Sequence, residues 1–378
     1  MNKKLMIIAG EVSGDMHGAS LITELRKLDD TIEIFGIGGD KMSAAGMNII
    51  HHINQMAFLG FAEILKHLPF IKRVQKDLIN IIVNKGIKTV VLIDYPGFNL
   101  SIAKKLKPMG IKIIYYISPQ VWAWGAGRIK KIKKLIDKML VVFPFEEELY
   151  KRAGMEAEFV GHPLLDRINE YNFLTKDELY KKFNLDAGKE ILLILPGSRL
   201  HEVEKMFPEC ISAAEKVADE FNLQIVVACS PNIEENFLET ISGSLDYTII
   251  KGYTYDLMKY AKIGIVKSGT STLEAGLLGL PMVIVYKTSY LTYLIGKNLV
   301  KLNNIGMANI VAGENIAVEL IQDMANIDSI YNECKKILLD DHLLNSIKLK
   351  LNILKGKLGT KGASRRAAKS IYSILNEA

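Results

Sequence analysis

Cysteine and long apolar runs are both scarce in this sequence of 378 residues. The three cysteines, Cys210, Cys229 and Cys334, are widely spaced and odd in number, which excludes a disulfide framework and is typical of a reduced, cytosolic protein. No apolar run reaches the ~18 residues that span a bilayer. The first apolar run, residues 5–9, is shorter than the ~7–15 residues of a secretory signal core, so we expect a β-strand there.

The remaining composition is that of a protein with full hydrophobic cores. Hydrophobic residues make up 49% and charged residues 24%, which excludes a disordered chain, and the length predicts two domains. The net charge of +6 is concentrated at residues 128–138, 348–361 and 365–369. These clusters favour an anionic partner (nucleotide phosphates, an anionic membrane surface or nucleic acid), or they are solvated helix faces.

Apolar runs alternate with helical stretches up to about residue 161. The expected strands are residues 5–9, 32–37, 89–93, 112–117 and 138–142, and the expected helices include 18–28 and 71–84. This alternation predicts a parallel, doubly wound α/β sheet whose strand-end loops gather on one edge. Gly36, Gly38 and Gly39 do not complete a dinucleotide fingerprint, because the sixth position of the motif is Lys41.

A second alternating series follows a polar stretch at residues 166–189. Its expected strands are 191–195, 224–228, 248–250, 263–266 and 282–286, and its expected helices are 202–221, 233–241, 255–259 and 272–278. We therefore predict Rossmann-like domains at 1–167 and 168–352, facing a cleft lined by strand-end loops. Residues 353–378 are expected to form a C-terminal helix that packs back on the first domain.

Residues 263–286 are typical of a strand, a turn, a helix and a second strand. Ser268, Gly269 and Thr270 then lie at the carboxyl end of the first strand, where the free N–H groups of a helix N-terminus attract phosphate. Glu274 is expected in the first turn of that helix. There it either completes a capping box with Ser271 or accepts hydrogen bonds from a ribose diol.

More candidate ligands of a nucleotide come from neighbouring loops. Ser198 and Arg199 follow the strand at 191–195, where the guanidinium fork suits phosphate oxygens, unless this is an ordinary turn with a surface arginine. The remaining members of the expected nucleotide set are Tyr253, Asn309, Glu319 and Gln322. Gln322 comes three residues after Glu319 on an expected helix, so both can face the cleft.

Asp94 directly follows an apolar strand in the first half. Its carboxylate can remove a proton from a hydroxyl nucleophile, or it caps a turn. Glu11, Asp15 and His17 are expected to share one loop and can serve equally as the base or as acceptor-binding groups. A base in one domain and a phosphate site in the other support displacement at a sugar C1 with a diphosphate leaving.

The chain contains no Asp-x-Asp motif of the kind that holds a diphosphate through a metal ion. An arginine and a helix N-terminus would then stabilise the leaving group, and no metal site is expected.

Residues 59–74 carry apolar side chains on more than one helical face, with Lys66, His67, Lys72 and Arg73 among them. The pattern fits a core helix as well as it fits a surface that touches lipid. The basic stretch 128–138 would add attraction to an anionic surface.

Nine ordered segments carry a resemblance to a known family. They are GEVSGDMHGA (10–19), GIGGDKM (36–42), IDYPGFN (93–99), YISPQVWAW (116–124), FPFEEELY (143–150), FVGHPLLD (159–166), LPGSRLHEV (195–203), SGTSTLEAGLLGLPMVIVYK (268–287) and NIVAG (309–313). Over nearly its full length the chain resembles the lipid-A-disaccharide synthases.

The resemblance implies a GT-B fold and an inverting glycosyltransferase. The implied reaction joins UDP-2,3-diacylglucosamine to 2,3-diacylglucosamine 1-phosphate and gives a β-1,6-linked disaccharide and UDP. The first domain would then take the acceptor and touch the membrane, and the second would bind UDP. The resemblance implies no metal and no cofactor, and it implies peripheral association with the anionic cytoplasmic face of an inner membrane; a homodimer stays open.

The chain departs from the family pattern at two places. Many relatives have a second aspartate where this chain has Gly97, so Asp94 carries more of the proposed catalysis. Around residues 309–313 the family's prolines are replaced by Ala308 and Val318, which affects loop shape. A UDP-sugar 2-epimerase of the same fold is the alternative enzyme. A nucleic-acid binder is disfavoured, because the basic clusters lack interleaved aromatic residues.

Overall fold

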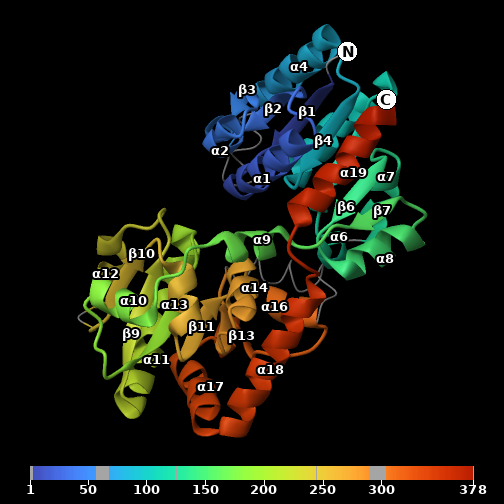
Figure 1. Cartoon of the computed structure of the whole chain (residues 1–378). Helices are drawn as coiled ribbons and strands as arrows, with labels where there is room; N and C mark the ends of the chain where they lie inside the picture. The colour runs from blue at the N-terminus through green and yellow to red at the C-terminus, as the bar shows by residue number, and fades with distance from the viewer. Residues whose placement is uncertain (1–2, 57–67, 125, 244, 289–303, 378) are drawn as a thin grey trace. The chain divides into compact units, whose positions relative to one another are not determined.

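The computed structural model describes residues 3–56, 68–124, 126–243, 245–288 and 304–377. The chain forms two compact units: Met1–Asn169 with Leu358–Ala378, and Glu170–Lys357. Each unit contains one sheet in which every strand pairing is parallel. Helices accompany both sheets (Figure 1), so the prediction of doubly wound α/β domains is confirmed.

The sheet of unit 1 has seven strands in the order β3-β2-β1-β4-β5-β6-β7. The strands are β1 (Lys4–Ala9), β2 (Glu33–Gly38), β3 (Asn48–His52), β4 (Thr89–Ile93), β5 (Lys112–Tyr116), β6 (Lys138–Val141) and β7 (Ala157–Phe159). All five predicted strands are present, and the sequence pattern did not reveal the two edge strands, β3 and β7. The central strand β4 is buried along its whole length, as expected for a parallel strand covered on both faces.

The described helices of unit 1 alternate with its strands along most of the chain. They are α1 (Val12–Leu28), α2 (Asp40–Ala44), α4 (Leu68–Lys85), α5 (Pro96–Leu106), α6 (Val121–Trp124), α7 (Ile129–Lys133), α8 (Pro144–Arg152), α9 (Pro163–Glu170) and α19 (Ala363–Glu377), with 3-10 turns η1 (Ile53–Gln55), η2 (Lys107–Met109) and η3 (Ala126–Arg128). Because α1 begins at Val12, the expectation of one shared loop for Glu11, Asp15 and His17 is wrong. Asp15 and His17 lie in the helix, and Glu11 occupies its N-cap position.

The C-terminal helix α19 runs alongside α1 in unit 1 (Figure 1). Ser370 Oγ donates to Glu158 at 2.7 Å, and Lys3 Nζ donates to the hydroxyl of Tyr372 at 2.9 Å. The guanidinium of Arg366 donates to the carbonyl of Val160 at 2.7 Å. These contacts connect α19 to β7 and to the residues just before β1 and just after β7.

The sheet of unit 2 has six strands in the order β10-β9-β8-β11-β12-β13. The strands are β8 (Glu190–Leu195), β9 (Leu223–Cys229), β10 (Thr248–Lys251), β11 (Ile263–Lys267), β12 (Met282–Tyr286) and β13 (Glu319–Ile321). The described helices are α10 (Lys176–Lys182), α11 (Leu200–Phe221), α12 (Glu235–Ser242), α13 (Thr254–Tyr260), α14 (Thr270–Leu277), α16 (Met307–Ala312), α17 (Ile327–Leu339) and α18 (Asp341–Lys357), with the 3-10 turn η4 (Gln322–Met324). The expected helix through Glu319 and Gln322 is wrong, since Glu319 begins β13 and Gln322 begins η4.

The strand order reverses at the centre of each sheet. β1 pairs with β4 so that Ala9 lies opposite Ile93, and β8 pairs with β11 so that Leu195 lies opposite Val266. The loops after each of these pairs therefore begin side by side and lead to opposite sides of the sheet. Open α/β sheets bind ligands in the crevice at this point.

Part of the predicted lipid-facing stretch, residues 59–67, lies outside the described residues, and residues 68–74 form the start of α4. Within the described part of the chain, no helix is both long enough and apolar enough to cross a membrane.

Two glycine substitutions test the packing of the first sheet. Gly36 has φ +153°, and a Cβ there would lie 1.8 Å from the carbonyl oxygen of Ile7. Gly36→Ala should therefore lower the free energy of unfolding by about 3 kcal/mol or more. A Cβ at Gly97 would meet none of the described atoms within 4 Å, so Gly97→Ala should change stability by less than about 1 kcal/mol. Equal denaturation midpoints for the two variants would contradict the described register.

Candidate active site

Asp94 lies immediately after β4 in a strained backbone conformation. Asp94 and Tyr95 have φ +45° and +46°, a region that residues other than glycine rarely adopt. The main-chain carbonyl of Asp94 accepts hydrogen bonds from the Tyr115 hydroxyl and, at 2.7 Å, from Asn99 Nδ2. Asn99 is fully buried, so these two side chains fix the Asp94 backbone and with it the direction of its carboxylate. Neither was predicted as a site residue, although Asn99 is the last residue of the motif at 93–99.

The carboxyl of Asp94 is electrostatically unusual. Burial, and after it the negative charge of Glu11, raise the pKa of Asp94 to about 6, although the backbone N–H of Tyr95 works in the opposite direction. Asp94 is therefore mostly ionised at neutral pH and yet a stronger base than an exposed aspartate. A general base works best when its pKa lies near the operating pH.

Asp15 stabilises the start of α2 by accepting hydrogen bonds from its backbone. Its buried carboxylate accepts backbone N–H groups from Gly39 at 2.7 Å, Met42 at 3.0 Å and Lys41 at 3.2 Å. These bonds hold the start of α2 against α1. A carboxylate with this many backbone donors is poorly placed to take a proton from a substrate.

His17 lies in α1 within electrostatic reach of His162 and Arg167. Burial, and then the charge of Arg167, lower the pKa of His17 to about 4. Burial likewise lowers the pKa of His162 to about 3, and its Nδ1 accepts the backbone N–H of Leu164 at 3.1 Å. Both imidazoles are neutral at pH 7. His162 and Arg167 were not predicted, although the motif at 159–166 pointed to this segment.

In unit 2, the strand-end loops present hydroxyl and guanidinium groups to solvent. Ser198, Arg199 and Thr270 are exposed, and the helices α11 and α14 that begin here have no side-chain cap among the described residues. Gly269 occupies the N-cap of α14. Ser268 differs from this group, because it is buried and its Oγ donates to the carbonyl of Ile305 at 2.9 Å.

Glu274 is the fifth residue of α14, in its second turn, so the expected position in the first turn and the capping box with Ser271 are both wrong. The Ser271 hydroxyl donates to the carbonyl of Lys267 at 3.1 Å. Glu274 accepts a hydrogen bond from the hydroxyl of Tyr255 at 2.9 Å. Its carboxylate is half buried, and carboxylate oxygens are the acceptors that a ribose diol requires.

Asn309 and Glu319 hold the loop before α16 in shape. Fully buried Asn309 donates to Glu319 at 2.8 Å, and its oxygen accepts the backbone N–H of Ile316 at 2.8 Å. Glu319 also accepts the N–H groups of Ile305 at 2.7 Å and Gly306 at 3.0 Å. The sequence pattern suggested that both residues are ligands, but these contacts give them a structural role.

Gln322 and Tyr253 complete the expected nucleotide set. Gln322 accepts the backbone N–H of Thr288 at 2.7 Å and so joins η4 to the end of β12. Tyr253 occupies the N-cap of α13, with its ring 5.1 Å from the ring of Phe183 and the Lys182 ammonium 5.1 Å from its centre. Neither Phe183 nor Lys182 was predicted.

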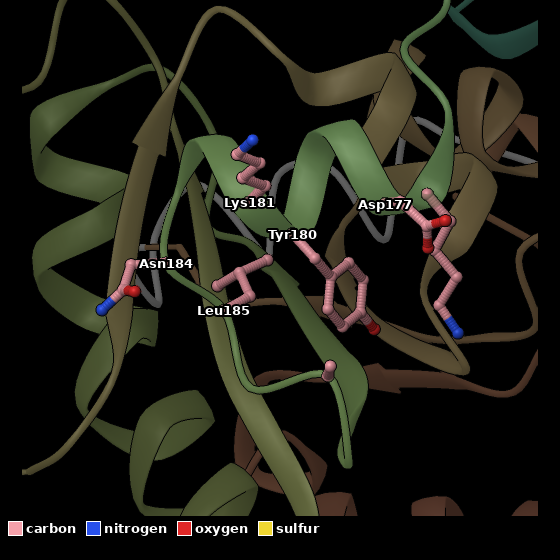
Figure 2. A pocket seen from close by; sticks show the side chains of 7 residues that line it. Asp177, Tyr180, Lys181, Asn184 and Leu185 are labelled. Carbon is pink, nitrogen blue, oxygen red and sulfur yellow. The ribbon is translucent and has the colours of Figure 1, made fainter.

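The pocket in Figure 2 lies elsewhere in unit 2. It has a volume of about 540 Å³ and is lined by α10 and the loop after it, including Tyr180, Asn184 and Leu185. None of the predicted site residues lines it. Among the residues that the structure describes, no group of three or more histidines, cysteines, aspartates or glutamates could hold a metal ion.

Solved structures with a similar fold define the fold class of this protein. A UDP-N-acetylglucosamine 2-epimerase described as putative, from Listeria monocytogenes, matches with a TM-score of 0.69 at 13% identity, covering 100% of this chain and 98% of that one. The calicheamicin glycosyltransferase CalG4 matches with a TM-score of 0.63 at 14% identity, covering 100% and 99%. These identities establish the fold alone. With two parallel sheets whose switch-point loops carry the candidate groups, the chain has the GT-B fold of glycosyltransferases.

Sequence comparison is more specific. The family model described as lipid-A-disaccharide synthetase matches residues 5–374. The lipid-A-disaccharide synthase of Geobacter sulfurreducens is 41% identical, over 99% of this chain and 98% of that protein, and the enzyme of Coxiella burnetii strain CbuG_Q212 is 37% identical over 99% of each. The chain belongs to the lipid-A-disaccharide synthase family of glycosyltransferases.

The brace formed by Asp15 gives a stability prediction. Asp15→Ala should lower the free energy of unfolding by about 3 kcal/mol, because it leaves several backbone donors without their charged acceptor. Asp30→Ala, at an exposed position beyond α1, should change it by less than about 0.5 kcal/mol. Urea denaturation followed by circular dichroism measures both. A fully stable Asp15→Ala protein with little turnover would instead return Asp15 to the catalytic set.

Proposed function

We propose that this protein joins UDP-2,3-diacylglucosamine to 2,3-diacylglucosamine 1-phosphate, forming the β-1,6-linked lipid A disaccharide 1-phosphate and UDP. Membership of the family supports a transferase that forms the lipid A disaccharide. The observation that carries the mechanism is the position of Asp94 at the strand switch point of unit 1, and its raised pKa supports the same role.

In the proposed reaction, Asp94 takes the proton of the acceptor's 6-hydroxyl as its oxygen attacks C1 of the donor sugar. The bond between C1 and the diphosphate oxygen breaks at the same time, and UDP leaves with the bonding electrons. Attack from the face opposite the diphosphate inverts C1 and gives the β linkage. Burial and, after it, the charge of Glu11 keep the Asp94 carboxyl basic, and the buried Asn99 and the Tyr115 hydroxyl hold its backbone.

UDP is proposed to bind at the switch point of unit 2. Ser198, Arg199 and the N-terminus of α14 at Gly269 and Thr270 would receive the diphosphate, since arginine and free N–H groups replace the charge of a metal ion there. Glu274 would accept from the ribose. Tyr253 would contact the base.

The base assignment is tested by turnover and by its pH dependence. Asp94→Asn should lower kcat by roughly 10²–10⁴-fold, since the amide cannot take up a proton. In the wild type a protonated Asp94 is inactive, so kcat/KM should rise with pH up to the pKa of about 6 and then level off. UDP release measured from pH 4.5 to 8.5 would show this rise in kcat/KM, and the residual activity of Asp94→Asn should lack it.

A matched control is Glu146→Gln in the same unit. Burial raises the pKa of Glu146 to about 7, so its titration could also affect the pH dependence of kcat/KM. If Asp94 is the base, Glu146→Gln should still show the rise in kcat/KM near pH 6. A folded Asp94→Asn protein that turns over within a few-fold of wild type would move the role to Glu11 or His17.

We also propose that the basic stretch 128–138 attracts an anionic membrane surface. Its apolar residues Ile129, Ile132 and Ile136 are buried, while Lys130, Lys131 and Lys134 are exposed. The charged face is thus anchored in the core of unit 1 and available to phospholipid head groups. Peripheral binding of this kind would bring the protein to its acylated substrates.

Vesicle flotation tests the membrane proposal. The protein should float with vesicles containing phosphatidylglycerol at low salt and be released as salt rises, because screening acts over about 10 Å at 0.1 M. Replacing Lys130, Lys131 and Lys134 by glutamate should abolish flotation. The same change at the exposed lysines 176, 181 and 182 of unit 2 should not, and equal losses in both triple variants would contradict a localised surface.

A further inference from the structure

Lys267, the last residue of β11, lies between the two loops proposed to receive the diphosphate. β11 and β8 are neighbours in register, so the loop after Leu195 and the loop after Lys267 begin side by side. The side chain of Lys267 is only 15% exposed, and its Nζ lies 2.8 Å from Oε2 of Glu202. Glu202 belongs to the first turn of α11, the helix that follows the first of these loops.

Two glycines give Lys267 this position. Gly197 has φ +102°, and a Cβ there would lie 3.3 Å from Cδ of Lys267. Gly269 has φ +155°, and a Cβ there would lie 3.9 Å from Nζ. The aliphatic part of the lysine therefore passes the first glycine, and the ammonium ends beside the second. Larger residues at either glycine would crowd the place where a phosphate approaches the backbone.

The charges around Lys267 do not cancel. Buried Glu202 faces two cations, since its Oε1 also lies 3.5 Å from Nη1 of Arg199. An ammonium has three N–H donors, and the described contacts of Lys267 are the Glu202 carboxylate and the face of the Tyr286 ring, 5.6 Å away. Within the described residues Glu202 Oε2 has no hydrogen bond of good geometry, so the carboxylate neutralises the lysine without occupying all its donors. Counting Lys267, Arg199 and Glu202, these described side chains leave one positive charge at the junction of the two loops.

We propose that Lys267 binds the diphosphate of the donor and that Glu202 positions its ammonium. The proposal rests on the nucleotide site proposed above and adds a residue to it. Negative charge accumulates on the diphosphate as the bond to C1 breaks, and a fixed cation in a partly buried site stabilises that charge without rearranging. Arg199 is 65% exposed and Lys267 15%, so Lys267 is the more rigidly held of the two cations.

A purely structural role is the competing explanation: Lys267 would only neutralise a buried glutamate. The double variant Lys267→Met/Glu202→Gln separates the two. It leaves no unpaired buried charge and keeps the net charge of the protein, so a structural role predicts normal ligand binding. The proposal predicts that UDP affinity, measured by calorimetry, falls about 10- to 100-fold, the loss typical of a charge-assisted contact.

Uridine is the second probe, because it shares the base and ribose but has no phosphate. Its affinity should be the same in the wild type and the double variant. Lys267→Arg, which keeps a cation, should retain most of the UDP affinity. The control double variant Lys262→Met/Glu190→Gln removes the ion pair at the other end of β11, where Nζ and Oε2 are 3.1 Å apart, and should bind UDP normally.

The possible outcomes distinguish a diphosphate-binding role of Lys267 from a purely structural one. UDP affinity that is unchanged in the Lys267/Glu202 double variant, or that falls together with uridine affinity, overturns the role of Lys267. If Arg199→Ala weakens UDP while the double variant does not, the nucleotide site stands and only this inference fails. A wild-type protein that does not bind UDP would overturn the proposed function and Lys267 with it.

Discussion

The parallel pairing of the two central strands in each sheet is the constraint on which the candidate site depends. β1 and β4 end side by side in unit 1, as do β8 and β11 in unit 2, and the loops after them lead to opposite sides. Glu11 and Asp94 begin the first pair of loops, and the groups proposed for the diphosphate begin the second. A shift of either pairing by one residue would turn these side chains to the opposite face of the sheet.

Buried polar side chains set the shape of these loops. Asp15 fixes the turn into α2, Asn99 fixes the strained backbone at Asp94, and the Asn309–Glu319 pair fixes the loop before α16. Each of them satisfies backbone groups that would otherwise be buried without partners. Several polar residues within the family motifs therefore stabilise the conformation of loops in this structure.

Much of the fold is predictable from the sequence, because central parallel strands are buried on both faces and appear as continuous apolar runs. The edge strands β3, β7 and β13 were missed for the same reason, whereas the edge strand β10 was predicted. β3 contains two histidines and is only half buried, while β7 and β13 are three residues long. Short or partly exposed strands have no apolar run that separates them from loops.

The candidate site was predictable only in part. Asp94 and Arg199 could be proposed because Asp94 directly follows a predicted strand and Arg199 lies in the loop after another, where open sheets bind ligands. The partners of a side chain depend on tertiary packing instead. Spacing could not show that Tyr255 donates to Glu274, or that Glu202, seven residues beyond the end of β8, reaches Lys267 at the end of β11.

We propose that this chain transfers a diacylglucosamine from UDP with inversion, and product analysis tests this proposal most directly. The purified protein is incubated with UDP-2,3-diacylglucosamine and 2,3-diacylglucosamine 1-phosphate, and the product is examined by mass spectrometry and by NMR of its anomeric proton. We expect the mass of the tetraacylated disaccharide 1-phosphate and the large coupling constant of a β linkage. A free monosaccharide with an altered C2 configuration, or a disaccharide with an α linkage, would contradict it.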